Sequence, residues 1–267
     1  MGIKTVITLQ ELSPIINSTV LIPTEHGVSD SVYITDQGVL KLFESASSEA
    51  ILEERNLLLN LSRLPITKHC SDIFFLHKKP CVLYEKLGGK SLESADDNHI
   101  IQIAGFMRRF HKQTAGKTSI NTPLFEVANL QMLIDQTQYH PFQQVFDSID
   151  IQLSRDGVIH GDLFLDNVLF TDDELSGVFD FIEACEGDFL FDLAVVAASW
   201  CLDGEDDHGK VNLLLTHYNA NIGFEDFIPY MKYALLYYAT TRYISHRDYQ
   251  SLLDKIIRLD EYAKGQM

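Results

Sequence analysis

The stretch Val158–Phe170 reads VIHGDLFLDNVLF, and it decides the fold because it places a polar loop between two strand-like segments. The loop has the pattern H-x-D-x-x-x-x-N, which runs from His160 through Asp162 to Asn167. Further along, Gly177–Phe181 is another apolar, strand-like segment, and it carries Asp180. The sequence therefore predicts acidic and amide side chains on loops at the ends of short strands.

These are the side chains that phosphoryl transfer from ATP needs. One carboxylate accepts the proton of the attacking hydroxyl, and oxygen ligands hold Mg²⁺ on the β- and γ-phosphates. On a loop between two strands, Asp162 and Asn167 can converge on one point with Asp180. An isolated H-x-D-x-x-x-x-N also arises by chance, because Asp and Asn commonly form turns. The following Asp180 and the organisation upstream favour the functional interpretation.

The rest of the chain divides into two parts of different composition. Residues 1–84 are typical of short strands interrupted by one helix, Gly88 and Gly89 break the pattern, and the chain is helix-rich from there on. We therefore expect an α+β fold with two lobes: a small β-rich ATP-binding lobe over residues 1–84, a hinge over 85–89, and a larger, mainly helical lobe for catalysis and substrate binding over 90–267.

Local patterns predict the elements of the small lobe. Ser29–Thr35 and Val39–Phe43 flank a turn and are typical of paired strands. Apolar residues then recur at helical spacing up to Leu64, with Ser48 as the expected N-cap and Pro65 as the stop. Residues 74–84 resemble a hairpin. After the hinge, residues 98–115 have the apolar stripe of an amphipathic helix.

Composition excludes several classes of protein. The 267 residues include 21 Lys and Arg against 38 Asp and Glu, a net charge of −17, which opposes binding to nucleic acid or an anionic membrane. No run of 18 apolar residues occurs, and the N-terminal residues lack a secretion signal. The four cysteines form no CxxC pair, so we expect reduced thiols in a cytoplasmic protein. We expect the protein to be either a monomer or a homodimer.

The chain resembles the superfamily of aminoglycoside phosphotransferases and choline kinases, which are relatives of the protein kinases. The resemblance is strongest over residues 158–201, where DFIEACEGDFLFDLA follows the loop and begins at Asp180. It implies a protein-kinase-like fold, Asp162 as the catalytic base, Asn167 and Asp180 as Mg²⁺ ligands, and His160 as the residue that orients the loop. Asp192 would support that loop or, alternatively, cap a helix.

Within the superfamily, several details are similar to the bacterial homoserine kinase branch. They include the Ala184-Cys185 pair, Trp200-Cys201, and a late helix that carries Arg242 among tyrosines. The small lobe is shorter than is usual in that branch, and Glu183 is an unusual acidic residue after the magnesium aspartate. The resemblance therefore indicates a kinase of small hydroxylated metabolites, with homoserine as the first substrate and choline, ethanolamine or an aminoglycoside as the alternatives.

The ATP side needs a lysine for the α- and β-phosphates and a helix glutamate to hold it. Lys41 is the lysine of the Val39–Phe43 strand and points to the opposite sheet face from its neighbours. Glu54 is the favoured partner, with Glu49 and Glu53 as alternatives. By resemblance, the linker would offer the backbone of Glu85 and Leu87 to adenine. Thr24–Ser31 would cover the phosphates, although a plain hairpin turn explains it nearly as well.

On the substrate side, Arg242 could hold a carboxylate with two parallel hydrogen bonds. A cationic substrate would need acidic or aromatic groups instead, and the candidates near the motif are Glu183, Asp188 and Trp200. A hypothesis of a different class is a catalytically silent nucleotide-binding module. The sequence opposes it, because a base, two metal ligands and a candidate lysine are all present.

Overall fold

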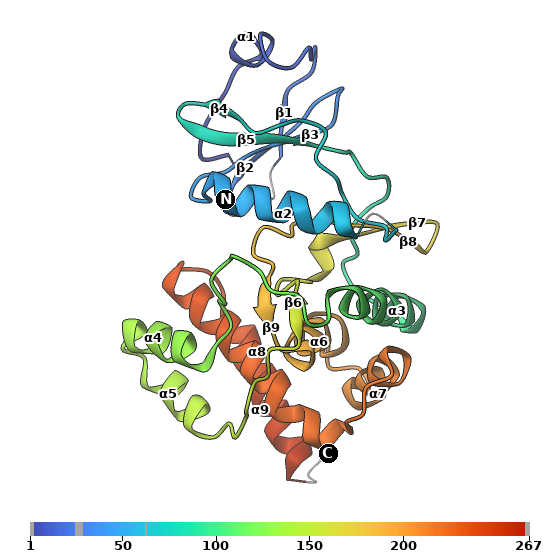
Figure 1. Ribbon diagram of the computed structural model, residues 1–267. Helices are drawn as coiled ribbons and strands as arrows, with labels where there is room; N and C mark the ends of the chain where they lie inside the picture. Colours follow the sequence, from blue (N-terminus) through green and yellow to red (C-terminus); the bar gives the residue numbers. More distant parts are fainter. Residues whose placement is uncertain (1–2, 25–28, 62, 265–267) are drawn as a thin grey trace. The chain divides into compact units, whose positions relative to one another are not determined.

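The computed structural model describes residues 3–24, 29–61 and 63–264, and these form two compact units (Figure 1). The first unit contains Met1–Gly89 together with Ser176–Ile182, and the second contains Lys90–Leu175 together with Glu183–Met267. The short segment Ser176–Ile182 thus folds with the N-terminal unit, although it follows the catalytic motif in the sequence. Part of the Thr24–Ser31 loop, residues 25–28, lies outside the described residues.

The first unit is built on an antiparallel sheet with the strand order β1-β2-β3-β5-β4. Its strands are β1 (Ile22–Pro23), β2 (Ser31–Ile34), β3 (Val39–Leu42), β4 (Phe74–Leu76) and β5 (Lys79–Tyr84), and a short helix α1 (Leu9–Leu12) precedes them. In this register Lys41 lies between Val32 on β2 and Val82 on β5. The β2–β3 pairing is the predicted one, and the pairing of β3 with β5 places a strand on the other side of Lys41 as well.

Helix α2 spans Ser48–Asn60 and buries Ile51, Glu54 and Leu58. Its N-cap is Ser47, whose hydroxyl accepts the N–H of Ala50, and not the predicted Ser48. The helix also ends four residues before the predicted end at Leu64. Either serine could cap by residue type, so only the backbone geometry distinguishes them.

Apolar residues pack on both faces of the sheet. Leu40 and Leu42 are completely buried and belong to a cluster with residues of α1, such as Leu12. A second cluster joins β5 to α2 and includes Ile51 and Val82, against which Ile182 packs. Lys41 alternates with Leu40 and Leu42 and has Val82 as its cross-strand neighbour, so it lies on the face toward the second cluster.

The second unit is mostly helical, as the sequence predicts (Figure 1). Its helices are α3 (Asp97–Thr114), α4 (Val127–Thr137), α5 (His140–Asp147), α6 (Phe189–Val196), α7 (Asp207–Tyr218), α8 (Phe224–Ile244) and α9 (Gln250–Ala263). Helix α8 is central, because it packs against α4, α5, α6 and α9, while α3 packs against α7. None of the helices in the described ranges is both long and apolar enough to cross a membrane.

The predicted catalytic motif lies on short strands and turns. Strand β6 (Gly157–Ile159) pairs antiparallel with β9 (Cys185–Gly187). After β6 come a single 3₁₀ turn (Leu165–Asn167) and the two-stranded sheet of β7 (Val168–Thr171) and β8 (Glu174–Val178). Helix α6 continues directly into a π-helical turn, η2 (Ala197–Cys201). The polar loop between β6 and β7 is thus anchored by strands at both ends.

Candidate active site

Lys41 lies in an acidic environment within the first unit. Its Nζ atom is 2.7 Å from Oδ1 of Asp180 and 3.1 Å from Oδ2 of Asp30, and its side chain is only 12% exposed. Burial lowers the pKa of Lys41, but the negative charges of Asp180 and Asp30 outweigh burial and hold that pKa well above its usual value. Lys41 is therefore a fixed positive charge, as a phosphate-binding lysine must be.

Asp180 reaches Lys41 because the segment before it pairs with the first unit. Val178 forms a parallel bridge with Ile66, its N–H donates to the Pro65 carbonyl at 2.9 Å, and its carbonyl accepts the N–H of Thr67 at 3.0 Å. Asp180 itself has a φ of +68°, a left-handed conformation that aspartate tolerates better than most residues. This turn directs the chain away from the strand at the residue that the sequence predicts as a metal ligand.

Glu54 is the buried member of the three candidate helix glutamates, since Glu49 is exposed and Glu53 half-buried. Its carboxylate lies 3.0 Å from Nε2 of His69 and accepts the Tyr84 hydroxyl at 2.5 Å. Glu54 also acts on Lys41 through its charge, which adds to the rise in the lysine pKa. The hydrogen bonds of Glu54 thus go to His69 and Tyr84, and the direct partners of Lys41 are aspartates.

Asp30 is a partner of Lys41 that the sequence pattern does not predict. Asp30 precedes β2, is 8% exposed, and also accepts the backbone N–H of Glu44 at 2.9 Å. A loop aspartate next to a strand is common, so no local pattern marks it. The register of β2 and β3, which pairs Val32 with Lys41, is what brings Asp30 close.

The linker after β5 makes backbone contacts within the first unit. The N–H of Glu85 donates to the Lys68 carbonyl at 2.8 Å, and the Glu85 carbonyl accepts the Thr67 hydroxyl at 3.3 Å. A carbonyl has two lone pairs, so the bond from Thr67 leaves one lone pair of the Glu85 carbonyl for a further donor. Leu87 packs against Gly177, where an added Cβ would lie 2.5 Å from the leucine Cδ1.

In the second unit, Asp162 and Asn167 lie together. The Asn167 amide nitrogen donates to the Asp162 backbone carbonyl at 2.7 Å and to its Oδ2 atom at 3.0 Å. These bonds use only the nitrogen of the amide, and the amide oxygen is the atom that a metal ion would bind. His160 accepts the backbone N–H of Asp162 on its Nδ1 atom at 3.2 Å, so its ring contacts the backbone of the predicted base.

Asp192 binds the backbone at the start of this loop. Its two carboxylate oxygens accept the backbone N–H groups of His160 at 3.0 Å and Gly161 at 2.8 Å, and His111 lies 2.8 Å from Oδ2. The side chain is fully buried. Burial raises the pKa of Asp192, but the hydrogen bond from His111 and the other donors outweigh it and keep that pKa below its usual value.

Of the two roles considered for Asp192, support of the loop is therefore the one observed. The N-cap of α6 is Asp188, which accepts the N–H groups of Leu190 and Phe191. His111 donates or accepts at both ring nitrogens, toward Asp192 and the Tyr218 hydroxyl, and stacks on Phe189 with ring centroids 4.1 Å apart. It is a buried structural histidine.

Asp192→Asn should lower the free energy of unfolding by about 1.5–3 kcal/mol, the usual worth of a hydrogen bond to a charged group. Because the folded-state pKa of Asp192 is depressed, its contribution is complete above the unfolded carboxyl pKa of about 3.9 and is lost as the pH falls through the folded value. Urea titrations from pH 7 to pH 3 measure both effects. The exposed control Asp254→Asn should change little, and an equal deficit of Asp192→Asn at every pH would contradict this account.

The loop also packs against α8. Gly161 has a φ of +80°, and a Cβ there would lie 2.2 Å from a ring atom of Phe125, so only glycine fits this close turn. The Tyr238 hydroxyl donates to the Gly161 carbonyl, and the Tyr238 ring meets Phe164 edge-on at 4.6 Å. The guanidinium of Arg242 lies over the Phe164 ring, 5.9 Å from its centroid. Arg242 is thus next to the predicted catalytic loop.

Glu183 remains a candidate on the acidic side of the site. It is exposed, and its negative charge contributes to the raised pKa of Tyr238. Burial raises the pKa of the Tyr238 hydroxyl, and the charges of Asp162 and Glu183 raise it further. Carboxylates of the site therefore act on a hydroxyl that donates to the loop at Gly161.

Two predicted substrate residues have structural roles instead. Asp188 is 4% exposed, and besides capping α6 it accepts the N–H and hydroxyl of Ser154. Trp200 is 1% exposed, and its indole N–H donates to the Leu163 carbonyl at 3.1 Å. The contacts of the Asp188 carboxylate and of the Trp200 indole are thus with the protein itself, and binding of a cationic substrate by these two side chains stays a prediction. Their proximity to the motif in sequence reflects support of the motif.

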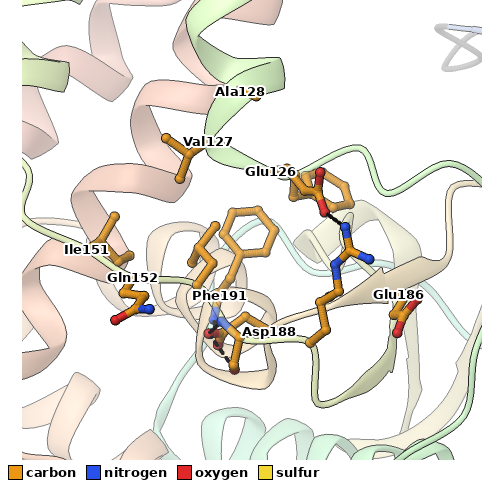
Figure 2. A pocket seen from close by; sticks show the side chains of 13 residues that line it. Glu126, Val127, Ala128, Ile151, Gln152, Glu186, Asp188 and Phe191 are labelled. Atoms are coloured by element: carbon orange, nitrogen blue, oxygen red, sulfur yellow. Dashed lines mark hydrogen bonds and ion pairs between the residues drawn. The ribbon is translucent and has the colours of Figure 1, made fainter.

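A pocket of about 350 Å³ lies elsewhere in the second unit (Figure 2). It is bordered by the start of α4, by residues 151–155 and by 186–188, and its lining includes Glu126 and Arg155, which form an ion pair. Of the residues predicted for the site, it contains only Asp188. Over the described residues, no three His, Cys, Asp or Glu side chains are grouped to hold a metal ion. Mg²⁺ bound through phosphates needs only one or two protein ligands.

Known proteins are similar to this chain in sequence. The model of the phosphotransferase enzyme family matches residues 20–220. The homoserine kinase of Methylobacillus glycogenes is 32% identical over 223 residues, which cover 73% of this chain and 68% of that protein. The homoserine kinase of Janthinobacterium sp. (strain Marseille) is 30% identical over 238 residues, with 78% and 69% covered.

Two solved structures show the same fold. Choline kinase LicA from Streptococcus pneumoniae has a TM-score of 0.70 at 16% identity, with 96% of this chain and 97% of that chain covered. The GDP complex of wild-type aminoglycoside 2'-phosphotransferase-IIIa has a TM-score of 0.65 at 15% identity, with 97% and 98% covered. The predicted protein-kinase-like fold, β-rich in its N-terminal part and helical in its C-terminal part, is confirmed.

Proposed function

Because this chain belongs to the phosphotransferase enzyme family, we propose that it transfers the γ-phosphoryl group of ATP to the hydroxyl of homoserine. The observation that carries the proposal is the Asp162–Asn167 pair, held on a loop whose start is fixed by the buried Asp192. The choice of homoserine rests on the similarity to homoserine kinases over more than 220 residues.

In the proposed reaction Asp162 accepts the proton of the substrate hydroxyl as its oxygen attacks the γ-phosphorus in line. Asn167 holds the Asp162 carboxylate through its amide nitrogen, which leaves its oxygen for a metal ion. Asp180 is the second ligand, and a bound Mg²⁺ would offset the charge of the phosphates. Lys41, charged and held by Asp180 and Asp30, is positioned to bind phosphate oxygens.

Arg242 is the proposed group for the substrate carboxylate, because its guanidinium already lies next to the catalytic loop over Phe164. Arg242→Lys should raise the KM for homoserine about tenfold or more, since an ammonium cannot reproduce the planar pair of hydrogen bonds. The KM for ATP should change little. Steady-state kinetics with homoserine measures both constants, and Arg247→Lys, which replaces an exposed arginine, is the matched control.

A panel of acceptors tests the substrate class independently of that variant. Homoserine should be phosphorylated, whereas choline, ethanolamine and an aminoglycoside should not, because Arg242 favours a carboxylate and repels a cation. Turnover of choline without turnover of homoserine would refute the proposed substrate and leave the kinase activity. ATP binding without transfer to any member of the panel would instead support a catalytically silent nucleotide-binding module.

A further inference from the structure

No residue of the π-helical turn η2, over Ala197–Cys201, takes part in the proposed phosphoryl transfer. It continues α6 without a break, and the N–H of Leu202 donates to the Ala197 carbonyl five residues earlier, at 3.3 Å. Turns of this kind are rare, are less regular than the α-helix, and occur frequently at functional sites. Since α6 also carries Asp192, the turn lies on the helix that already supports the catalytic loop.

Two consecutive residues of the turn bind the catalytic loop on either side of Phe164. The Ser199 hydroxyl accepts the backbone N–H of Leu165 at 3.2 Å, and the Trp200 indole donates to the Leu163 carbonyl at 3.1 Å. Both contacts therefore come from one turn and bracket a single residue of the loop.

The turn is held from its other side by α9. Lys255 is half-buried, and its Nζ atom donates to the Ala198 carbonyl at 2.7 Å. Arg258 donates to the Leu202 carbonyl, where the turn ends, at 3.3 Å. Both bonds occupy backbone carbonyls of the turn and its cap, so α9 fixes the segment that presents Ser199 and Trp200.

We propose that the π-helical turn positions the catalytic loop, with Ser199 and Trp200 as positioning residues and Lys255 as the side chain that fixes the turn. The segment they hold, Leu163–Leu165, lies between Asp162 and Asn167. A misplacement of about 1 Å at a reacting group can reduce the rate about 10²-fold. The inference rests on the proposed phosphotransfer function for its kinetic consequence, but the contacts themselves stand without it.

The first test is amide hydrogen exchange of the nucleotide-free protein. In Ser199→Ala the Leu165 N–H loses its acceptor, and peptides that cover residues 160–170 should exchange about tenfold faster, the effect of losing one hydrogen bond. Lys255→Met should produce a smaller increase in the same peptides. The control Ser148→Ala, which removes a hydroxyl that contacts Lys232 in the same unit, should leave them unchanged. Unchanged exchange of this segment in folded Ser199→Ala would overturn the proposal.

The second test is kinetic and includes Trp200→Phe, which keeps an aromatic ring but loses the N–H donor. Both Ser199→Ala and Trp200→Phe should lower kcat about tenfold while the KM for ATP stays within twofold of the parent. A general loss of folding would instead reduce the active fraction and leave the per-site kcat unchanged, which active-site titration detects. A per-site kcat equal to the parent in both variants would contradict the positioning role. Because the exchange test needs no acceptor, it remains decisive even if homoserine is not the substrate.

Discussion

Asp162→Asn is expected to lower kcat by about 10²–10⁴-fold, the usual contribution of a general base, while ATP binding persists. The substitution keeps the shape of the side chain but removes the group that accepts the substrate proton. The Asn167 bond to the Asp162 backbone carbonyl, at 2.7 Å, does not depend on the side chain, so the loop should keep its conformation. Coupled measurement of ADP release gives kcat, and calorimetric titration gives the Kd of ATP with Mg²⁺.

The matched control is Asp166→Asn, which removes an exposed carboxylate from the same loop. It should retain near-parental activity, since only the Asp162 carboxylate is proposed to accept the proton. Equal losses in the two variants would indicate that the charge of the loop matters and that no single base acts there. Near-normal turnover of Asp162→Asn would remove the assignment altogether.

Asp180→Ala is expected to weaken Mg²⁺-dependent binding of ATP by about 10- to 150-fold, which corresponds to one charge-assisted contact of about 1.5–3 kcal/mol. The phosphates would then meet a site with one metal ligand fewer. Turnover should fall at least as far, because the metal also offsets the charge of the transferred group. Titration of ATP at several Mg²⁺ concentrations measures the dependence.

Asp30→Asn distinguishes the two roles considered for Asp180, which are metal binding and the ion pair with Lys41. Both aspartates form ion pairs with Lys41, at 3.1 Å and 2.7 Å, but only Asp180 is proposed to bind metal. Asp30→Asn should therefore keep the parental Mg²⁺ dependence even if its affinity for ATP changes. If Asp180→Ala shows the same Mg²⁺ dependence as the parent, Asp180 is only an ion-pair partner of Lys41.

Local patterns were sufficient to predict the features that depend on spacing along the chain. The alternation of β3 placed Lys41 opposite Leu40 and Leu42, and the structure shows those two leucines fully buried. The spacing of Asp162 and Asn167 predicted their proximity, and a hydrogen bond of 3.0 Å joins them. Such predictions succeed because the side-chain direction follows from the strand period or from a short loop.

Features that depend on tertiary packing could not be predicted in this way. The pairing of Asp30 with Lys41 follows from the register of two strands. The contacts of Glu54 with His69 and Tyr84 follow from the packing of helix α2 against a loop and against β5. The burial of Trp200 and Asp188 could not be predicted either, because an aromatic or acidic side chain near a motif has the same sequence signature whether it binds a ligand or supports the motif from the core.

The central claim is that this protein phosphorylates the hydroxyl of homoserine with ATP. Phosphorus NMR of a reaction with homoserine, ATP and Mg²⁺ tests it most directly, because the spectrum identifies the acceptor atom. The account predicts a new phosphomonoester signal, split by the two protons of the adjacent methylene group, that grows in step with ADP and is absent with Asp162→Asn. Release of ADP with inorganic phosphate as the sole new phosphorus signal would contradict it.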